Sequence, residues 1–233
     1  MAVLSEDPVL LDIIKQGRDA HAATVRKVWP ELAHLTDQEI KEKHKAKRDI
    51  AKVTMFSLAY GARAKKIAFI LDIPVKEAER VLSTFKSDVY PTLSKWLDDA
   101  AEEVKTKGQV DIVGGYRRRF KPTGNDFVDQ GTIRSIVNSL IQGASAYITK
   151  ICTLRVLAAL NAAGIHFKLI ILIHDSITIQ VEDKDIKRAY DIVADSMKFV
   201  MHGVTLRSEG AVNKDMSKLT EQKITDLFES DEG

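Results

Sequence analysis

Residues 167–181 constrain the fold of this chain more than any other stretch. Two β-branched, apolar segments flank a polar centre, His174-Asp175-Ser176, which is typical of two strands joined by a tight turn. The chain up to about Lys107 instead carries helix signals, with Pro, Asp or Thr before the periodic segments and Gly after several of them. The sequence therefore predicts a mainly helical α+β fold, whose character changes between residues 110 and 130.

Local signals place the individual elements. Thr36 and Glu39 form a capping-box pattern that starts a basic helix, and Tyr60-Gly61 marks its end. Gly114-Gly115 predicts a turn after a short strand. We expect helices over 8–17, 19–29, 36–60, from 74 and over 91–107, a strand over 109–113 and a long helix over 132–160.

Composition excludes several classes of protein. The 233 residues include one cysteine, Cys152, which excludes an internal disulfide framework and a cysteine-rich zinc site. The first eleven residues lack the basic start and long apolar run of a secretory signal. The most apolar stretch, 167–173, is too short to cross a bilayer. These features predict a cytoplasmic protein without a membrane partner.

Charge is unevenly distributed although the net charge is only +2. The last fourteen residues hold five acidic residues and one lysine, so the rest of the chain is basic. Basic residues cluster in two places: Lys41, Lys43, Lys45, Lys47, Arg48 and Lys52, and then Arg117, Arg118, Arg119 and Lys121. A lysine run is commonly a solvated helix face, and that interpretation stays open.

The spacing of Arg48, Lys52, Phe56 and Tyr60 is four residues at each step. At roughly 100° per residue, these four side chains share one helix face, with two cations before two aromatics. Cations near a helix N-terminus oppose the helix dipole unless an anion neutralises them, and a triphosphate suits that position. The alternative is a helix whose aromatics face the core and whose cations are solvated.

Several motifs in order resemble family A DNA polymerases, the group of bacterial polymerase I. Residues 48–61 resemble the R-x3-K-x3-F-x3-Y-G motif of the fingers helix, and residues 18–24 resemble an upstream D-x-H-x-x-T segment. Residues 114–122 resemble a G-R-R loop, residues 134–143 an R-x3-N-x3-Q-G helix, and residues 173–175 the palm hairpin with its metal-binding aspartate. The resemblance covers about residues 1 to 216.

The resemblance implies roles for the incoming dNTP. Arg48, Lys52 and His21 would contact its triphosphate, and Lys52 would also protonate the departing pyrophosphate. Phe56 would pack on the deoxyribose, and Tyr60 would lie beside the templating base. Phenylalanine at position 56 further implies rejection of dideoxynucleotides.

It also implies roles for primer-template and metal. Arg134 would bind backbone phosphate, while Asn138 and Gln142 would test the minor-groove acceptors that every correct base pair presents. His174 would contact the primer end, and Asp175 would bind magnesium. Taken alone, an Asp in a turn more commonly makes local hydrogen bonds.

Two-metal phosphoryl transfer needs at least two converging carboxylates. The family has another aspartate in a D-Y-S-x-I-E-like strand, which does not occur here, and Ser176 stands where the family usually has Glu. We therefore expect the C-terminal subunit of a split polymerase, compatible with a bacteriophage source and hence a host cytoplasm, in which a second chain shares two Mg²⁺ ions. The alternative is a non-catalytic DNA-binding or scaffold remnant.

The expected organisation is a fingers-like lobe at 1–125, the C-terminal part of the palm at 126–217 and an acidic tail at 218–233. Within the tail, residues 224–228 partly match a peptide that docks on bacterial sliding clamps. A solvated tail or short capping helix is the alternative interpretation of this segment.

Overall fold

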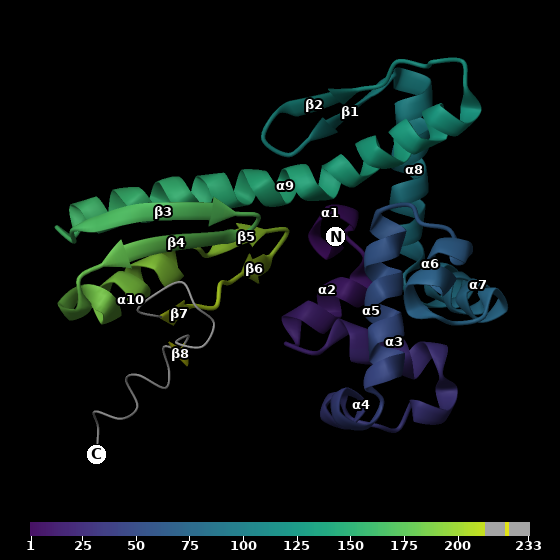
Figure 1. Cartoon of the computed structure of the whole chain (residues 1–233), viewed down its shortest axis with the longest axis horizontal. Helices are drawn as coiled ribbons and strands as arrows, with labels where there is room; N and C mark the ends of the chain where they lie inside the picture. The colour runs from purple at the N-terminus through teal and green to yellow at the C-terminus, as the bar shows by residue number, and fades with distance from the viewer. Residues whose placement is uncertain (213–221, 224–233) are drawn as a thin grey trace. The chain divides into compact units, whose positions relative to one another are not determined.

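The computed structural model describes residues 1–212 and 222–223. Helices dominate, and the strands form short antiparallel hairpins, so the predicted α+β class is confirmed (Figure 1). The chain divides into two compact units, one spanning Met1–Ala144 and the other the described residues from Ser145 onward.

In the first unit, aspartates cap the starts of the second and third helices. The Asp7 carboxylate accepts hydrogen bonds from the N–H groups of Val9 and Leu10, and its other oxygen accepts from Leu93 N–H at 3.0 Å. Such caps satisfy the free N–H groups of a helix start. The elements are α1 (Ala2–Ser5), α2 (Pro8–Lys15), α3 (Ala20–Val28) and the 3₁₀ turn η1 (Pro30–Leu32).

The predicted basic helix over 36–60 is two helices, which corrects the expectation of one. The Thr36–Glu39 capping box is present, but α4 (Asp37–Lys43) ends at His44, whose φ of −126° and ψ of 37° are not helical, and α5 (Lys45–Ala59) begins there. Both helices pack against α3, and Ile40 is fully buried. Tertiary packing therefore requires the chain to change direction at His44, although no Gly or Pro marks this position in the sequence.

Four further helical segments complete the helical part: α6 (Ala64–Leu71), α7 (Val75–Thr84), the π-helical segment η2 (Phe85–Val89) and α8 (Pro91–Lys107). The predicted starts at Pro74 and Pro91 are confirmed, and Gly108 ends α8 with a φ of 67°. A main core contains side chains from helices α2, α3, α4, α5, α8 and α9 and from η2. It includes Val25, Ile40, Phe85, Tyr90, Leu93 and Ile136.

A β-hairpin and a long helix follow. β1 (Gln109–Ile112) pairs with β2 (Tyr116–Arg119), and α9 spans Asp126–Ala162. The helix starts earlier than predicted, because the Asn125 side chain accepts hydrogen bonds from the N–H groups of Phe127 and Val128. Gly143 is needed inside it, since a Cβ there would lie 2.6 Å from Ile112 Cγ2.

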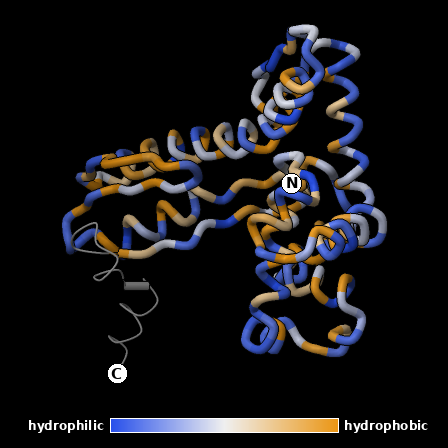
Figure 2. The backbone as a smooth tube through the Cα atoms, turned by 45° about the vertical axis from the view of Figure 1, so that its right-hand side comes forward, coloured by the Kyte–Doolittle hydropathy of each residue, from blue (hydrophilic) through white to orange (hydrophobic). Residues whose placement is uncertain are grey.

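The second unit holds the predicted hairpin. β3 (Phe167–Ile173) pairs with β4 (Ser176–Val181), which confirms two strands joined by a tight turn. Figure 2 shows the apolar character of β3, and its residues 169–173 are 38–48% exposed. The remaining elements are η3 (Asp183–Asp185), α10 (Ile186–Ser196), β5 (Phe199–Met201), β6 (Val204–Leu206), β7 (Ala211–Val212) and β8 (Gln222–Lys223).

Among the described residues, α9 is long and apolar enough to cross a membrane when length and composition alone are considered. Its first half, however, contributes Ile133, Ile136 and Val137 to the core of the first unit. Its second half contributes Val156 and Leu160 to a small core with α10. Packing against protein thus accounts for apolar residues along both halves.

Candidate active site

The four-residue stripe lies on α5 and its C-cap as the spacing predicted. Phe56 is 48% exposed and Tyr60 is 50% exposed, so neither aromatic ring is buried in the core. Lys52 is exposed, whereas the Arg48 side chain is only 23% exposed. Because α5 begins at Lys45, Arg48 lies in its first turn, where no acidic residue of α5 balances the helix dipole.

Arg48 is held by a carboxylate from α3's N-terminus. Its Nε donates to Asp19 Oδ2 at 2.8 Å, and its Nη2 lies 2.7 Å from the same oxygen in an ion pair. Asp19 Oδ1 meanwhile accepts hydrogen bonds from the N–H groups of His21 and Ala22, and so caps α3. Burial by itself raises the pKa of Asp19, but the hydrogen bonds from Ala22 N–H, Arg48 and His21 N–H outweigh it and lower that pKa.

His21 lies beside this ion pair and faces the stripe. Its ring centroid is 6.2 Å from that of Phe56, and its buried Nδ1 has no hydrogen-bond partner. Burial is the largest cause that lowers the His21 pKa; Asp19 opposes it, while Arg48 and Lys52 add to it. A negative charge brought close to the imidazole would therefore favour its protonated form.

Helix α9 brings the second predicted motif to the end of α5. Gln142 Nε2 donates to Tyr60 Oη at 2.9 Å. Arg134 packs against Gly61, where an added Cβ would lie 2.6 Å from Arg134 Cδ. Between them, the buried Oδ1 of Asn138 has no partner. The first unit therefore brings together site residues from α3, α5 and α9.

The predicted metal-binding aspartate lies at the hairpin turn of the second unit. Ile173 pairs with Ser176, which leaves His174 and Asp175 as the two turn residues. His174 has a φ of 53°, a left-handed conformation that costs a non-glycine residue roughly 1 kcal/mol or more. Asp175 is exposed, and Ser176 Oγ donates to Ile173 O at 2.9 Å.

These residues by themselves do not fit a two-metal centre. Within residues 1–212 and 222–223, no three His, Cys, Asp or Glu side chains are grouped as metal ligands. Asp175 supplies the oxygen donors that a hard cation prefers, but a single carboxylate cannot clamp two ions.

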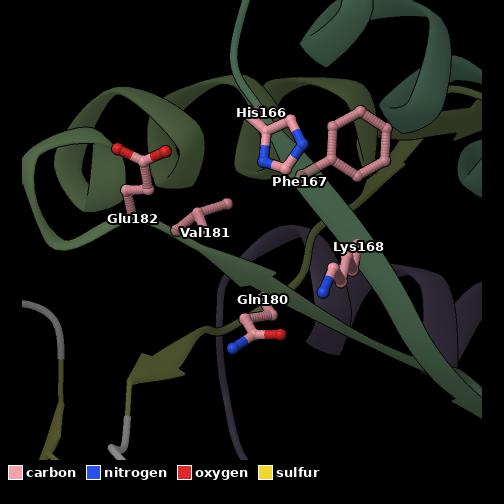
Figure 3. A pocket seen from close by; sticks show the side chains of 6 residues that line it. All are labelled: His166, Phe167, Lys168, Gln180, Val181 and Glu182. Atoms are coloured by element: carbon pink, nitrogen blue, oxygen red, sulfur yellow. The ribbon is translucent and has the colours of Figure 1, made fainter.

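Two cavities lie away from these residues. One, of about 150 Å³, lies at the end of the β3–β4 hairpin opposite the turn and is lined by His166, Phe167, Lys168, Gln180, Val181 and Glu182 (Figure 3). The other, of about 290 Å³, lies between α8 and β1. Both are smaller than typical small-molecule sites, and no predicted site residue lines either.

Sequence reasoning missed the contact made by Asp19, although it lies in the D-x-H-x-x-T segment. The local signal was its position before a helix, which predicts a cap but not an ion pair 29 residues away. Thr24 of the same segment is structural: its hydroxyl lies 3.0 Å from Tyr90 Oη in the core. Burial, the largest cause, raises the pKa of Tyr90 to about 12.

The chain belongs to DNA polymerase family A, whose sequence profile matches residues 1–218. It is 30% identical over 223 residues to DNA polymerase I of Aquifex aeolicus, covering 91% of this chain and 36% of that protein. It is also 30% identical over 188 residues to that of Helicobacter pylori strain J99, covering 79% of this chain and 19% of that protein.

The fold has a counterpart among solved structures. The POL domain of Pol1 from M. smegmatis, in complex with DNA primer-template and dNTP, matches with a TM-score of 0.78 at 24% identity. The match covers 88% of this chain and 35% of that chain. The chain thus spans about 35% of the length of that solved chain, and 36% and 19% of the two polymerase I relatives described above. The predicted clamp peptide at 224–228 lies outside the described residues.

Proposed function

We propose that this chain is the C-terminal subunit of a split family A DNA-directed DNA polymerase that acts in DNA replication inside the cell. In this proposal residues 1–125 serve as fingers, residues 126–217 as part of the palm and residues 218–233 as an acidic tail. The observation that carries the proposal is the convergence of α3, α5 and α9 around Phe56 and Tyr60 in one unit.

The first unit would bind the incoming dNTP. Arg48 retains N–H donors beyond those given to Asp19, and together with Lys52 and His21 it would hold the triphosphate. The half-exposed ring of Phe56 would pack on the deoxyribose. The hydroxyl of Tyr60 is oriented by the hydrogen bond that it accepts from Gln142. All of these groups would bind and orient the nucleotide before reaction.

The reaction joins the primer 3′ oxygen to the α-phosphorus and breaks the bond to the β-phosphate oxygen. The primer hydroxyl loses its proton, and Lys52 would give a proton to the departing pyrophosphate. Polymerases of this family use Mg²⁺, which when bound stabilises the charge on the attacking and leaving oxygens. Asp175 would be one ligand, and His174 would contact the primer end.

Arg134, Asn138 and Gln142 would contact primer-template. They follow one another at four-residue spacing on α9, and the unpartnered Oδ1 of Asn138 is free to accept a hydrogen bond. Buried polar groups without a partner are rare, so a ligand that supplies one is favoured. A minor-groove donor such as the guanine amino group would satisfy it.

A partner chain would supply the missing carboxylate. Support comes from β3, which carries five consecutive apolar residues that are each at least 38% exposed and pairs with β4 alone among the described strands. Exposed apolar strands of this kind are interaction sites or aggregation liabilities. A strand of the partner would cover this surface and bring its aspartate to the turn.

The experiment that tests the proposal is primer extension with Mg²⁺ by the chain alone and with a chain that contains a D-Y-S-x-I-E-like segment. We expect synthesis only in the mixture, and a loss of about a thousandfold in Asp175→Ala, because metal binding contributes several kcal/mol to catalysis. DNA affinity should barely change. Robust extension by this chain alone would contradict the split-enzyme proposal.

A scaffold or DNA-binding remnant is the second candidate function. The observation that favours it is the absence of a complete acidic metal site within the described residues. The same variant separates the two functions, because DNA binding needs no metal ligand at position 175. An unchanged rate of synthesis by the mixture with Asp175→Ala would favour the scaffold.

A further inference from the structure

We propose that Asp19 is a positioning residue. Its carboxylate is a built-in counter-ion of Arg48, and a polyphosphate must compete with it for the Arg48 guanidinium. The proposal rests on the proposed nucleotide function of Arg48 and assigns a role to a residue outside the predicted site. Its consequence is that the chain limits its own affinity for anions at this place.

The Asp19–Arg48 pair has the geometry of a strong interaction. Two guanidinium nitrogens, Nε and Nη2, converge on the single oxygen Oδ2, and both side chains are about four-fifths shielded from solvent. Charge-assisted hydrogen bonds of this length are roughly twice as strong as neutral ones. Arg48 therefore carries little uncompensated charge in the free protein, even though it stands in the first turn of α5.

Asp19 is fixed, so it is Arg48 that must move or share its donors. Oδ1 of Asp19 caps α3 through two backbone N–H groups, and the Asp19 N–H donates to Asp37 Oδ2 at 2.9 Å. Asp37 is in turn paired with Arg26, which also donates to Leu35 O at 3.0 Å. This chain of contacts anchors the Asp19 carboxylate to the start of α4.

The surroundings are arranged for an anion that Asp19 only partly replaces. Lys52 is exposed one turn further along α5 and forms no ion pair among the residues that the structure describes. His21 keeps an unpartnered buried Nδ1 beside the pair. A polyphosphate would be attracted by these groups and by Arg48, and would compete with the carboxylate of Asp19 for the guanidinium of Arg48.

Removal of the carboxylate charge should therefore strengthen anion binding, whereas loss of a purely structural residue would weaken it. Asp19→Asn keeps a side-chain oxygen for the cap of α3, and Asp19→Ser does so with a different geometry. Both variants leave Arg48 without its counter-ion. Asp98→Asn, on an exposed position of α8, is the matched control for a change in net charge.

The test is calorimetric titration of the full chain with inorganic tripolyphosphate. We expect Asp19→Asn and Asp19→Ser to bind about fivefold more tightly than the wild type, the effect of removing one partly screened charge, and Asp98→Asn to match the wild type. In Arg48→Gln the further change Asp19→Asn should alter affinity by less than about twofold, because the effect passes through Arg48. Circular dichroism melts verify folding of each variant.

Unchanged or weaker binding by both folded Asp19 variants, with Arg48→Gln weaker than the wild type, would overturn the inference and leave the nucleotide site intact. A full gain from Asp19→Asn in the Arg48→Gln background would also overturn it, since Arg48 would then have no part. Equal binding by the wild type and Arg48→Gln would refute the triphosphate site itself, and the inference with it.

Discussion

In the Met1–Ala144 unit, three residues of the stripe have partners outside α5: Arg48 lies 2.8 Å from Asp19, Tyr60 lies 2.9 Å from Gln142, and the Phe56 ring faces that of His21. In the second unit, Asp175 stands exposed at a turn next to a strand whose apolar side chains meet solvent. The first arrangement is supported by its own tertiary contacts. The second lacks such contacts, and it is the surface that the proposed partner chain would cover.

The comparison predicts that anion binding survives without any partner and depends on the first unit. Lys52→Ala should weaken tripolyphosphate binding by the full chain about tenfold or more, since a hydrogen bond to a charged group contributes about 1.5–3 kcal/mol. Lys86→Ala, an exposed lysine on η2, is the matched control and should bind like the wild type. Equal losses of affinity in both variants would mean that net charge alone, and not a specific site, determines tripolyphosphate binding.

The close contact between α5 and α9 can be tested through glycine. Gly61 has a φ of 62°, and a Cβ there would also overlap Arg134, whereas Gly17 has a φ of 66° and open space around it. Gly61→Ala should lower the free energy of unfolding by about 1–3 kcal/mol more than Gly17→Ala. Urea denaturation of both variants measures the difference, and equal losses would mean that Arg134 yields without cost.

The exposed strand of the second unit should make the isolated chain self-associate. Ile170, 46% exposed at the irregularity in β3 pairing, is the position for a charge. Ile170→Lys should reduce association seen by sedimentation velocity at rising protein concentration, because charged side chains protect sheet edges. Val200→Lys, at a residue of β5 that is 68% exposed, is the control. Monomeric wild type at high concentration would contradict the expectation.

The smallest effect concerns pH and His21. Its pKa lies below the ordinary value of 6.5, so the unfolded chain binds more protons and stability should fall as pH drops below about 6.5. Bound tripolyphosphate should raise the His21 pKa. The affinity of the chain for tripolyphosphate should therefore increase as the pH drops over the same range. Both trends should flatten in His21→Gln, measured by urea denaturation and calorimetry; an unchanged pH profile in that variant would exclude His21 as the titrating group.

Much of the candidate site could be predicted because its signals are local. Four-residue spacing placed Arg48, Lys52, Phe56 and Tyr60 along one stripe, and the turn at His174-Asp175 followed from flanking β-branched segments. The helix break at His44 could not be predicted, because it depends on how α4 and α5 pack against α3. Strands β5 and β6 were also missed, since three-residue strands carry too little periodicity.

What the sequence by itself determined is the set of motifs, their order and the caps that start most helices, because these depend on residues a few positions apart. Tertiary structure alone decided which of the cations is neutralised and which is available. Asp19 reaches Arg48 across 29 residues, and Arg134 reaches Gly61 across a longer separation still. Such pairings depend on how helices pack, and no local pattern specifies them.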